Sequence, residues 1–326
     1  MRPWNTLTEA GQIRRLRPLA MAALDRFAVI PTRLRLVGGF TNVLFRVDTA
    51  DGAYAMRVDL HQDHSDTDVQ IELGWLAALA AETDLDVAVS VPAIDGSPFV
   101  NVGAPGVPGE RRCTLFEWIP GKPIGDDPTP EHYHRLGQLS ARLHEHGATY
   151  RPGVKPMQWD RIFYWPEEVD PVVIDKPEMA QHFSGDRRQI LDRCIEVVGG
   201  AFDRLDPAGA QIVHADLHPW NVHVYRSRMV ALDFEDVAMA HRVQDIAITL
   251  YYQRDHDAYT EFVAAFTAGY REIQPWPETY PGEVDHFVAA RGLMFVNYVL
   301  NLLDDPSDFY ATLFPRLRAF LEKHDT

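Results

Sequence analysis

The chain has few features of secreted or membrane-bound proteins. It contains only two cysteines, Cys113 and Cys194, in 326 residues, which excludes the disulfide framework of small secreted domains. No apolar run reaches the length of about 20 residues that a membrane-spanning helix needs. The basic residues near the N-terminus are not followed by the apolar core of a secretion signal. We therefore expect a cytoplasmic protein with no membrane partner.

Positive charge is also scarce. Lysine and arginine total 31 against 47 aspartates and glutamates, for a net charge of −16. A nucleic-acid partner is therefore not expected, because phosphate backbones attract clusters of basic side chains. The acidic balance is compatible with a cationic substrate. The sequence has no Walker A loop, so a different class of nucleoside triphosphatase is not supported.

The order of the predicted elements indicates an α+β fold with two lobes, a β-rich lobe at residues 1–118 and a mainly helical lobe at 119–326. In the first lobe, alternating apolar residues and turn signals predict strands around one helix. The strands are expected at 33–37, 43–48, 53–60, 98–102 and 111–118, and the helix at 69–81. In the second lobe, Thr129 is expected to cap a helix that starts at Pro130. Further helices are expected at 186–202, 245–253, 259–273 and 284–301.

One segment of the helical lobe carries the strongest functional signal. Asp216 is followed by four residues and then Asn221, and a predicted hairpin at residues 222–232 leads to Asp233. Kinases use this spacing to hold a hydroxyl and magnesium beside a nucleotide phosphate. This reaction needs one carboxylate beside the attacking hydroxyl. It also needs an amide oxygen and a second carboxylate as ligands of Mg2+, which prefers hard oxygen ligands. The alternative is that Asp216 and Asn221 only cap turns.

Two other functions remain open from the residues alone. In a metal-dependent hydrolase, His214, Asp216 and His218 would ligate zinc or iron. The shell could be completed by the pair His61 and His64 or by the pair His144 and His146. The third possibility is a protein that binds nucleotide without turnover.

With its catalytic motif in a helical lobe after a β-rich lobe, the chain resembles the aminoglycoside phosphotransferase and choline kinase family over residues 37–250. The resemblance implies a protein-kinase-like fold and transfer of the γ-phosphate of ATP to a hydroxyl of a small molecule or a protein serine or threonine. It makes Asp216 the catalytic base or the group that orients the hydroxyl. Asn221 and Asp233 become the Mg2+ ligands.

The resemblance also implies a nucleotide site in the β-rich lobe. Arg57 stands where protein kinases have a lysine, and Glu72, on an apolar helix face, is its expected partner. A glutamate that reaches solvent is the alternative. The backbone of Glu117 and Ile119 is expected to bind the adenine edge. A turn covering the phosphates is expected from Gly38, Gly39, Thr41 and Asn42.

Several further residues are interpreted through the same resemblance. Asp245 is expected to brace the catalytic loop, and His214 to hold it. Ala215 replaces the glycine common after that histidine, and Glu235 replaces the glycine of Asp-Phe-Gly. The aromatic segment 157–165 either lines the acceptor site or packs the helical lobe.

Overall fold

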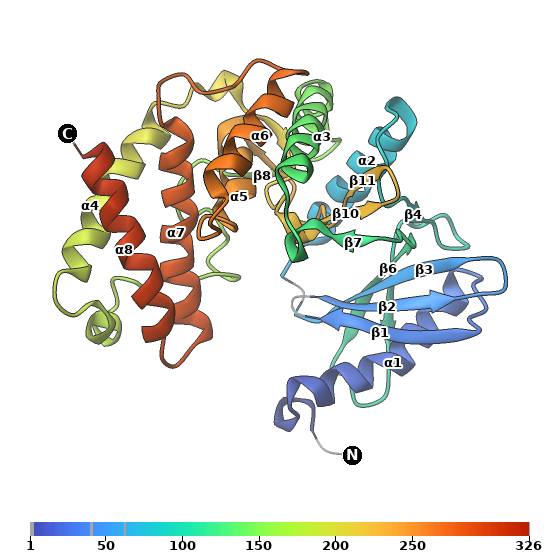
Figure 1. Cartoon of the computed structure of the whole chain (residues 1–326). Coiled ribbons are helices and arrows are strands. Elements are labelled where there is room, and N and C mark those ends of the chain that lie inside the picture. The colour runs from blue at the N-terminus through green and yellow to red at the C-terminus, as the bar shows by residue number, and fades with distance from the viewer. Residues whose placement is uncertain (1–2, 40–41, 62, 326) are drawn as a thin grey trace. The chain divides into compact units, whose positions relative to one another are not determined.

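The chain folds into two compact units. The computed structural model describes residues 3–39, 42–61 and 63–325 (Figure 1). The first unit comprises Met1–Lys122, Pro152–Lys155 and His223–Glu235, and the second comprises Pro123–Arg151, Pro156–Val222 and Asp236–Thr326. Residues 223–235, which the sequence places in the helical lobe, therefore belong to the β-rich unit.

The first unit is built on a six-stranded antiparallel sheet. Its strand order is β1-β2-β3-β6-β4, and β5 pairs with β6. Long apolar side chains alternate along β2, which buries every second residue, as expected for a strand with one face on the core. The strands are β1 (Arg33–Gly39), β2 (Asn42–Asp48), β3 (Ala53–Asp59), β4 (Ser90–Val91), β5 (Val100–Gly103) and β6 (Glu110–Glu117).

Two helices accompany this sheet. Helix α2 (Asp66–Glu82) is the predicted one, and it starts with a capping box between Ser65 and Asp68. Helix α1 (Glu9–Arg26) was not predicted from the sequence. Its apolar face, which includes Leu16 and Leu24, packs into the same core as the strands.

The predicted hairpin after the catalytic segment is confirmed. It consists of β10 (Val222–Tyr225) and β11 (Arg228–Ala231), and β10 also pairs with β7 (Lys122–Pro123). An isolated bridge joins Ala231 to Val87, and Arg228 forms an ion pair with Asp86. These contacts explain why residues 223–235 join the first unit.

The second unit is mainly helical (Figure 1). Thr129 caps the first helix as predicted, because its side chain accepts a hydrogen bond from the amide of His132. The helices are α3 (Pro130–Thr149), α4 (Arg187–Asp203), α5 (Arg242–Tyr251), α6 (Tyr259–Arg271), α7 (Glu283–Leu302) and α8 (Ser307–His324). A small sheet has the order β8 (Met157–Gln158), β12 (Ala238–Ala240) and β9 (Gln211–Val213). Short 3-10 helices of this unit occur at Ile124–Asp126, Pro177–Phe183, Pro207–Gly209 and Pro219–Asn221, and the first unit has one at Trp4–Thr6.

Helices α3 and α6 pack unusually closely. A Cβ atom on Gly269 would lie 1.9 Å from the backbone oxygen of His134, and one on Gly137 would lie 2.1 Å from that of Phe266. Only glycine leaves room for this backbone contact. The close packing fixes the position of α3, whose His144 contacts Asp245, the residue that bonds the catalytic loop.

Among the described residues, no helix is both long and apolar enough to cross a membrane.

Candidate active site

The catalytic loop, residues 214–221, belongs to the second unit and follows β9. Ala215 has a φ of +62°, in the left-handed region that glycine adopts without penalty. This conformation explains why glycine is common at this position in the family that the chain resembles. The backbone amide of Ala215 donates to Asp245 Oδ1 over 2.6 Å, which compensates for the strain.

Asp245 braces the loop, as the resemblance implied. Its second oxygen, Oδ2, lies 2.9 Å from His144 Nε2. The other ring nitrogen of His144 lies 2.8 Å from the hydroxyl of Tyr270. His144 and Asp245 are buried, so each polar atom depends on these partners. A chain of hydrogen bonds therefore runs from α6 through α3 and α5 to the catalytic loop.

Asp216 and Asn221 come together as predicted. The side-chain amide of Asn221 donates to the backbone oxygen of Asp216 at 3.0 Å and to Asp216 Oδ2 at 3.2 Å. Because the Asn221 nitrogen is used inside the loop, its Oδ1 is the atom suited to a metal ion.

His218 organises the same loop through its backbone. Its Nδ1 accepts hydrogen bonds from the amides of Trp220 and Asn221, both at 3.2 Å. Burial, followed by the charges of Arg291 and His214, lowers the pKa of His218 to about 3. The ring is therefore neutral at physiological pH, with Nδ1 as an acceptor.

The hydrolase alternative finds no support in this geometry. Its zinc or iron site would need His214, Asp216 and His218, but His218 Nδ1 is occupied by the loop amides, and the amide of Asp216 donates to His214 Nδ1 at 3.3 Å. Across residues 3–39, 42–61 and 63–325, no three histidine, cysteine, aspartate or glutamate side chains are grouped to hold a metal ion.

The sequence did not identify Arg291 of α7, which contacts the candidate base. Its Nη2 donates to Asp216 Oδ1 at 2.7 Å and to the Tyr252 hydroxyl at 2.8 Å. The arginine side chain is only 6% exposed. Burial by itself lowers the pKa of Arg291, but Tyr252, Asp216 and Tyr164 raise it overall, so the guanidinium stays charged. Arg291 thus fixes Oδ1 of Asp216, and Oδ2 remains to accept the hydrogen bond from Asn221.

We expect Arg291→Met to lower kcat at least about tenfold, because a misplaced carboxylate loses much of the contribution of a positioned acid or base. The KM for nucleotide should change little. Tyr252→Phe is the matched control, since it removes only the hydroxyl that Arg291 also contacts, and it should retain most of the activity. Steady-state kinetics and melting temperatures of both variants make the test. A wild-type kcat in a folded Arg291→Met protein contradicts this role.

Different residues of the aromatic segment 157–165 fit the two interpretations, packing of the helical lobe and lining of the acceptor site. Trp159 packs the unit: it is 3% exposed and stacks on Tyr164 with ring centres 4.9 Å apart. Tyr164 also lies in the electrostatic environment of Asp216 and Arg291. Its buried hydroxyl has no hydrogen-bond partner among the described residues. Tyr164 is therefore a member of the segment that lies near the charged groups of the loop.

The predicted pair of Arg57 and Glu72 is present in the first unit. Arg57 Nη1 and Nη2 donate to the two Glu72 oxygens at 2.7 and 2.5 Å. The Glu72 side chain is 2% exposed, so the alternative of a glutamate that reaches solvent is wrong. Burial acts to lower the pKa of Arg57, but Glu72, Glu235 and Asp233 raise it overall. The guanidinium also lies 5.1 Å from the centre of the Phe116 ring.

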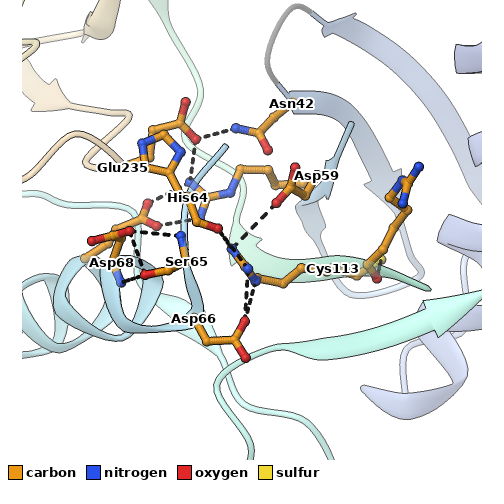
Figure 2. A network of polar contacts seen from close by, with 12 residues as sticks. Asn42, Asp59, His64, Ser65, Asp66, Asp68, Cys113 and Glu235 are labelled. Carbon is orange, nitrogen blue, oxygen red and sulfur yellow. Dashed lines mark hydrogen bonds and ion pairs between the residues drawn. The ribbon is translucent and has the colours of Figure 1, made fainter. Parts of the chain in front are cut away.

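Glu235 is a second site residue that the sequence did not assign to the nucleotide site. Its Oε2 lies 3.7 Å from Arg57 Nη1 and accepts a hydrogen bond from the Asn42 side chain (Figure 2). Because Glu235 stands where protein kinases have glycine, no motif predicts this contact. The carboxylate links the start of β2 to the arginine of β3.

A neighbouring arginine extends the network shown in Figure 2. Arg112 Nη2 lies 2.9 Å from Asp66 Oδ1, and its Nη1 lies 3.6 Å from Asp59 Oδ2. The same guanidinium donates twice to the backbone oxygen of His64 at 3.0 Å. These bonds tie the start of α2, and hence Glu72, to the sheet that carries Arg57.

Asp233 follows the hairpin with a φ of +64°, a conformation that aspartate and asparagine tolerate better than most residues. The next residue, Phe234, is buried and packs edge-on against Trp75, with ring centres 5.4 Å apart. Asp233 raises the pKa of Arg57, so its carboxylate belongs to the same charged group.

The remaining predicted nucleotide contacts lie along the sheet. The backbone amide of Glu117 donates to the backbone oxygen of Val89 at 3.0 Å. The predicted contact of Glu117 with the adenine edge would therefore use its carbonyl oxygen. Gly38 and Gly39 are in β1 rather than in a turn, because their backbone continues the pairing with Leu44 and Val43. Thr41 lies outside the described residues.

The structure thus forms two charged clusters. Asp216, Asn221 and Arg291 belong to the second unit, while Arg57, Glu72, Asn42, Glu235 and Asp233 belong to the first.

Comparisons with known proteins identify the family. Residues 32–281 match the model of the phosphotransferase enzyme family, APH. The chain belongs to this family. It is therefore a phosphotransferase with a kinase-like fold.

Individual relatives are similar over almost the whole chain. Amicoumacin kinase of Bacillus subtilis is 22% identical over 297 residues, which cover 86% of this chain and 84% of the relative. The solved structure of a microcompartment-associated aminopropanol kinase has a TM-score of 0.75 at 21% identity, covering 93% of this chain and 94% of that one. Amicoumacin kinase hAmiN in complex with AMP-PNP, Ca2+ and Ami has a TM-score of 0.76 at 17% identity, covering 97% and 96%.

Proposed function

We propose that Asp216 acts on the acceptor hydroxyl, and that Asn221 and Asp233 hold Mg2+, in the ATP-dependent phosphorylation of a small-molecule alcohol by this phosphotransferase. The observation that carries the proposal is the half-buried, oriented carboxylate of Asp216, whose Oδ1 is fixed by Arg291 while Asn221 bonds its Oδ2. A general base needs a fixed position beside the proton that it accepts.

The nucleotide assignment rests on the first unit. Arg57 binds the phosphates with Glu72 as its partner, because a guanidinium can bond a carboxylate and a phosphate oxygen together. The backbone of Glu117 and Ile119 binds the adenine edge. The AMP-PNP complex of hAmiN supports a nucleotide site in this fold.

The charge around Arg57 favours a divalent cation as well. Glu72, Glu235 and Asp233 all act on this one guanidinium, so carboxylates outnumber the cation at this point. Mg2+ prefers hard oxygen ligands such as Asp233 and the Asn221 amide oxygen. When bound, the ion would neutralise charge on the phosphates. The Ca2+ in the hAmiN complex supports a divalent site.

We expect Asp233→Asn to weaken the magnesium dependence of ATP binding, because a charged ligand becomes neutral while the left-handed backbone is still tolerated. Calorimetric titration of ATP across a magnesium series measures the effect. Asp59→Asn is the matched control, since Asp59 pairs with Arg112 in the same network. The assignment is wrong if Asp233→Asn and wild type respond identically to magnesium.

The acceptor class is proposed to be a small amino alcohol. Aminopropanol kinase is a close structural neighbour, and the net charge of −16 favours a cation. Aromatic rings such as Tyr252 and Tyr164 near Asp216 can contribute roughly 0.5–2 kcal/mol each to cation binding.

The decisive experiment is a panel of alcohols with ATP and magnesium, read as ADP release at matched ionic strength. We expect amino alcohols to give the highest kcat/KM and their neutral analogues to give at least about tenfold less. If neutral or anionic alcohols, or protein serines, are consistently better, the acceptor class is wrong. If no alcohol stimulates ADP release above the water rate, phosphotransfer itself is not supported.

A further inference from the structure

A cavity of about 320 Å3 lies in the second unit among the ends of α5 and α6, helix α7 and helix α8. No residue of the catalytic loop lines it. Its walls combine apolar side chains of α8, including Leu313, Leu317 and Phe320, with the cations Arg254 and Arg316. The volume is within the range of sites for small organic ligands.

Arg254 has an unusual environment for a guanidinium. Its Nη1 donates to the backbone oxygen of Tyr251, and its charged group lies 3.5 Å from the centre of the Tyr251 ring. No carboxylate among the described residues forms an ion pair with it. Burial lowers the pKa of Arg254, as does the charge of Arg316, while Tyr251 and Asp255 act in the opposite direction without reversing the shift. The protein therefore holds a partly desolvated cation beside Arg316, and the carboxylate that acts on both, Asp255, already pairs with Arg316.

The other charges at the cavity are already compensated. Arg316 pairs with Asp255, while Lys323 and His324 both contact Asp285, at 2.6 and 3.1 Å. Arg254 is thus the surplus cation of the lining. A second polar group of the lining also lacks a partner: the Tyr251 side chain is 4% exposed, and its hydroxyl forms no hydrogen bond within the described residues.

We propose that this cavity binds a small amphipathic anion, with its acidic group on Arg254 and Arg316 and its apolar body against Leu313, Leu317 and Phe320. An anion completes the hydrogen bonds of Arg254, because guanidinium groups bind carboxylate, sulfonate and phosphate oxygens through paired N–H donors. The apolar wall of α8 excludes a bare inorganic ion as the best ligand, since such an ion would leave that wall exposed to water. The lining residues differ from those of the proposed acceptor and nucleotide sites.

The experiment uses two fluorescent probes with the same aromatic body. One is 8-anilino-1-naphthalenesulfonate, and the other is N-phenyl-1-naphthylamine, which lacks the sulfonate. We expect the full-length protein to bind the sulfonate saturably with one site, at least about tenfold more tightly than the amine. Arg254→Met should remove most of that preference. Arg318→Met is the matched control, because Arg318 lies on the same helix as Arg316 but pairs with Asp186 outside the cavity.

A second variant tests the location independently of charge. Ala319 lines the cavity and is exposed, so Ala319→Trp should block it without burying a new side chain in the core. We expect this variant to weaken binding of both probes while its melting temperature stays near that of wild type. Equal sulfonate affinity in wild type, Arg254→Met and Ala319→Trp would overturn the proposal. Displacement of the sulfonate probe by ATP with magnesium would also overturn it, since the probe would then occupy the nucleotide site.

Discussion

Asp216→Asn and Asp216→Ala are both expected to lower kcat by a factor on the order of 10² or more, with the affinity for ATP nearly unchanged. The physical reason is that a positioned acid or base contributes about that much to a proton transfer. The asparagine variant keeps an oxygen that can accept the bond from Arg291, which wild type makes at 2.7 Å. The alanine variant leaves the buried Arg291 without its carboxylate, so it should also be less stable.

The two variants together separate catalysis from folding. If kcat falls equally in both while only Asp216→Ala loses thermal stability, the loss of activity comes from the carboxylate and not from the fold. Single-turnover kinetics with saturating ATP, calorimetric ATP binding and melting curves supply the three measurements. Near wild-type turnover in Asp216→Asn would remove Asp216 from the role of base.

The second large effect is expected at the pair of Arg57 and Glu72. Arg57→Ala should lower kcat/KM for ATP by about 10² or more, because it removes a bidentate phosphate contact and leaves Glu72 buried without its cation. Glu72→Ala should also lower kcat/KM for ATP, since Arg57 then loses the carboxylate that orients it. Arg57→Lys should remain active, although a point charge cannot reproduce both bonds of the planar guanidinium.

A double-mutant cycle on kcat/KM for ATP measures the coupling. The double variant should lose less than the sum of the single losses, by about 0.5–3 kcal/mol. Arg35 and Asp48 provide a matched control on the same sheet, because their pair spans 3.4 Å but their side chains are 42% and 24% exposed. Mutations of that pair should change kcat/KM little, since exposed ion pairs contribute about 0–1 kcal/mol. Additive losses at Arg57 and Glu72 would show that the pair does not act as one unit.

The local sequence was sufficient for the motif, the hairpin and the buried pair. Turn residues between two apolar runs predict the hairpin at residues 222–232. An acidic residue on an apolar helix face, as at Glu72, predicts a buried partner. In each case the signal is contained within a few neighbouring residues, and tertiary packing does not override it.

Helices α1 and α8 were missed for a common reason. Each contains an internal proline, Pro18 in α1 and Pro315 in α8. Proline removes a backbone donor and disfavours a helix interior, so the local sequence argues against one continuous helix through that position. In the folded chain, packing of residues such as Leu16 and Leu317 against their units compensates for that local cost.

Arg291 and Glu235 depend on contacts that one sequence does not encode locally. Arg291 is 75 residues from Asp216 along the chain. The available signal is a charged residue within the mainly apolar part of α7 that follows His286, by the same reasoning that identifies Glu72. Glu235 lies two residues after the left-handed backbone of Asp233, and its partners Asn42 and Arg57 are far away along the chain, Asn42 by 193 residues.

Substitutions at the glycine contact between α3 and α6 are expected to inactivate the protein from a distance. Gly137 and Gly269 touch no reacting group, yet any larger residue there pushes the two helices apart. His144 and Tyr270 belong to these helices and end the chain of bonds that supports Ala215 and Asp245. Random mutagenesis should therefore yield loss-of-activity substitutions at these two distant glycines, in proteins that still bind ATP normally.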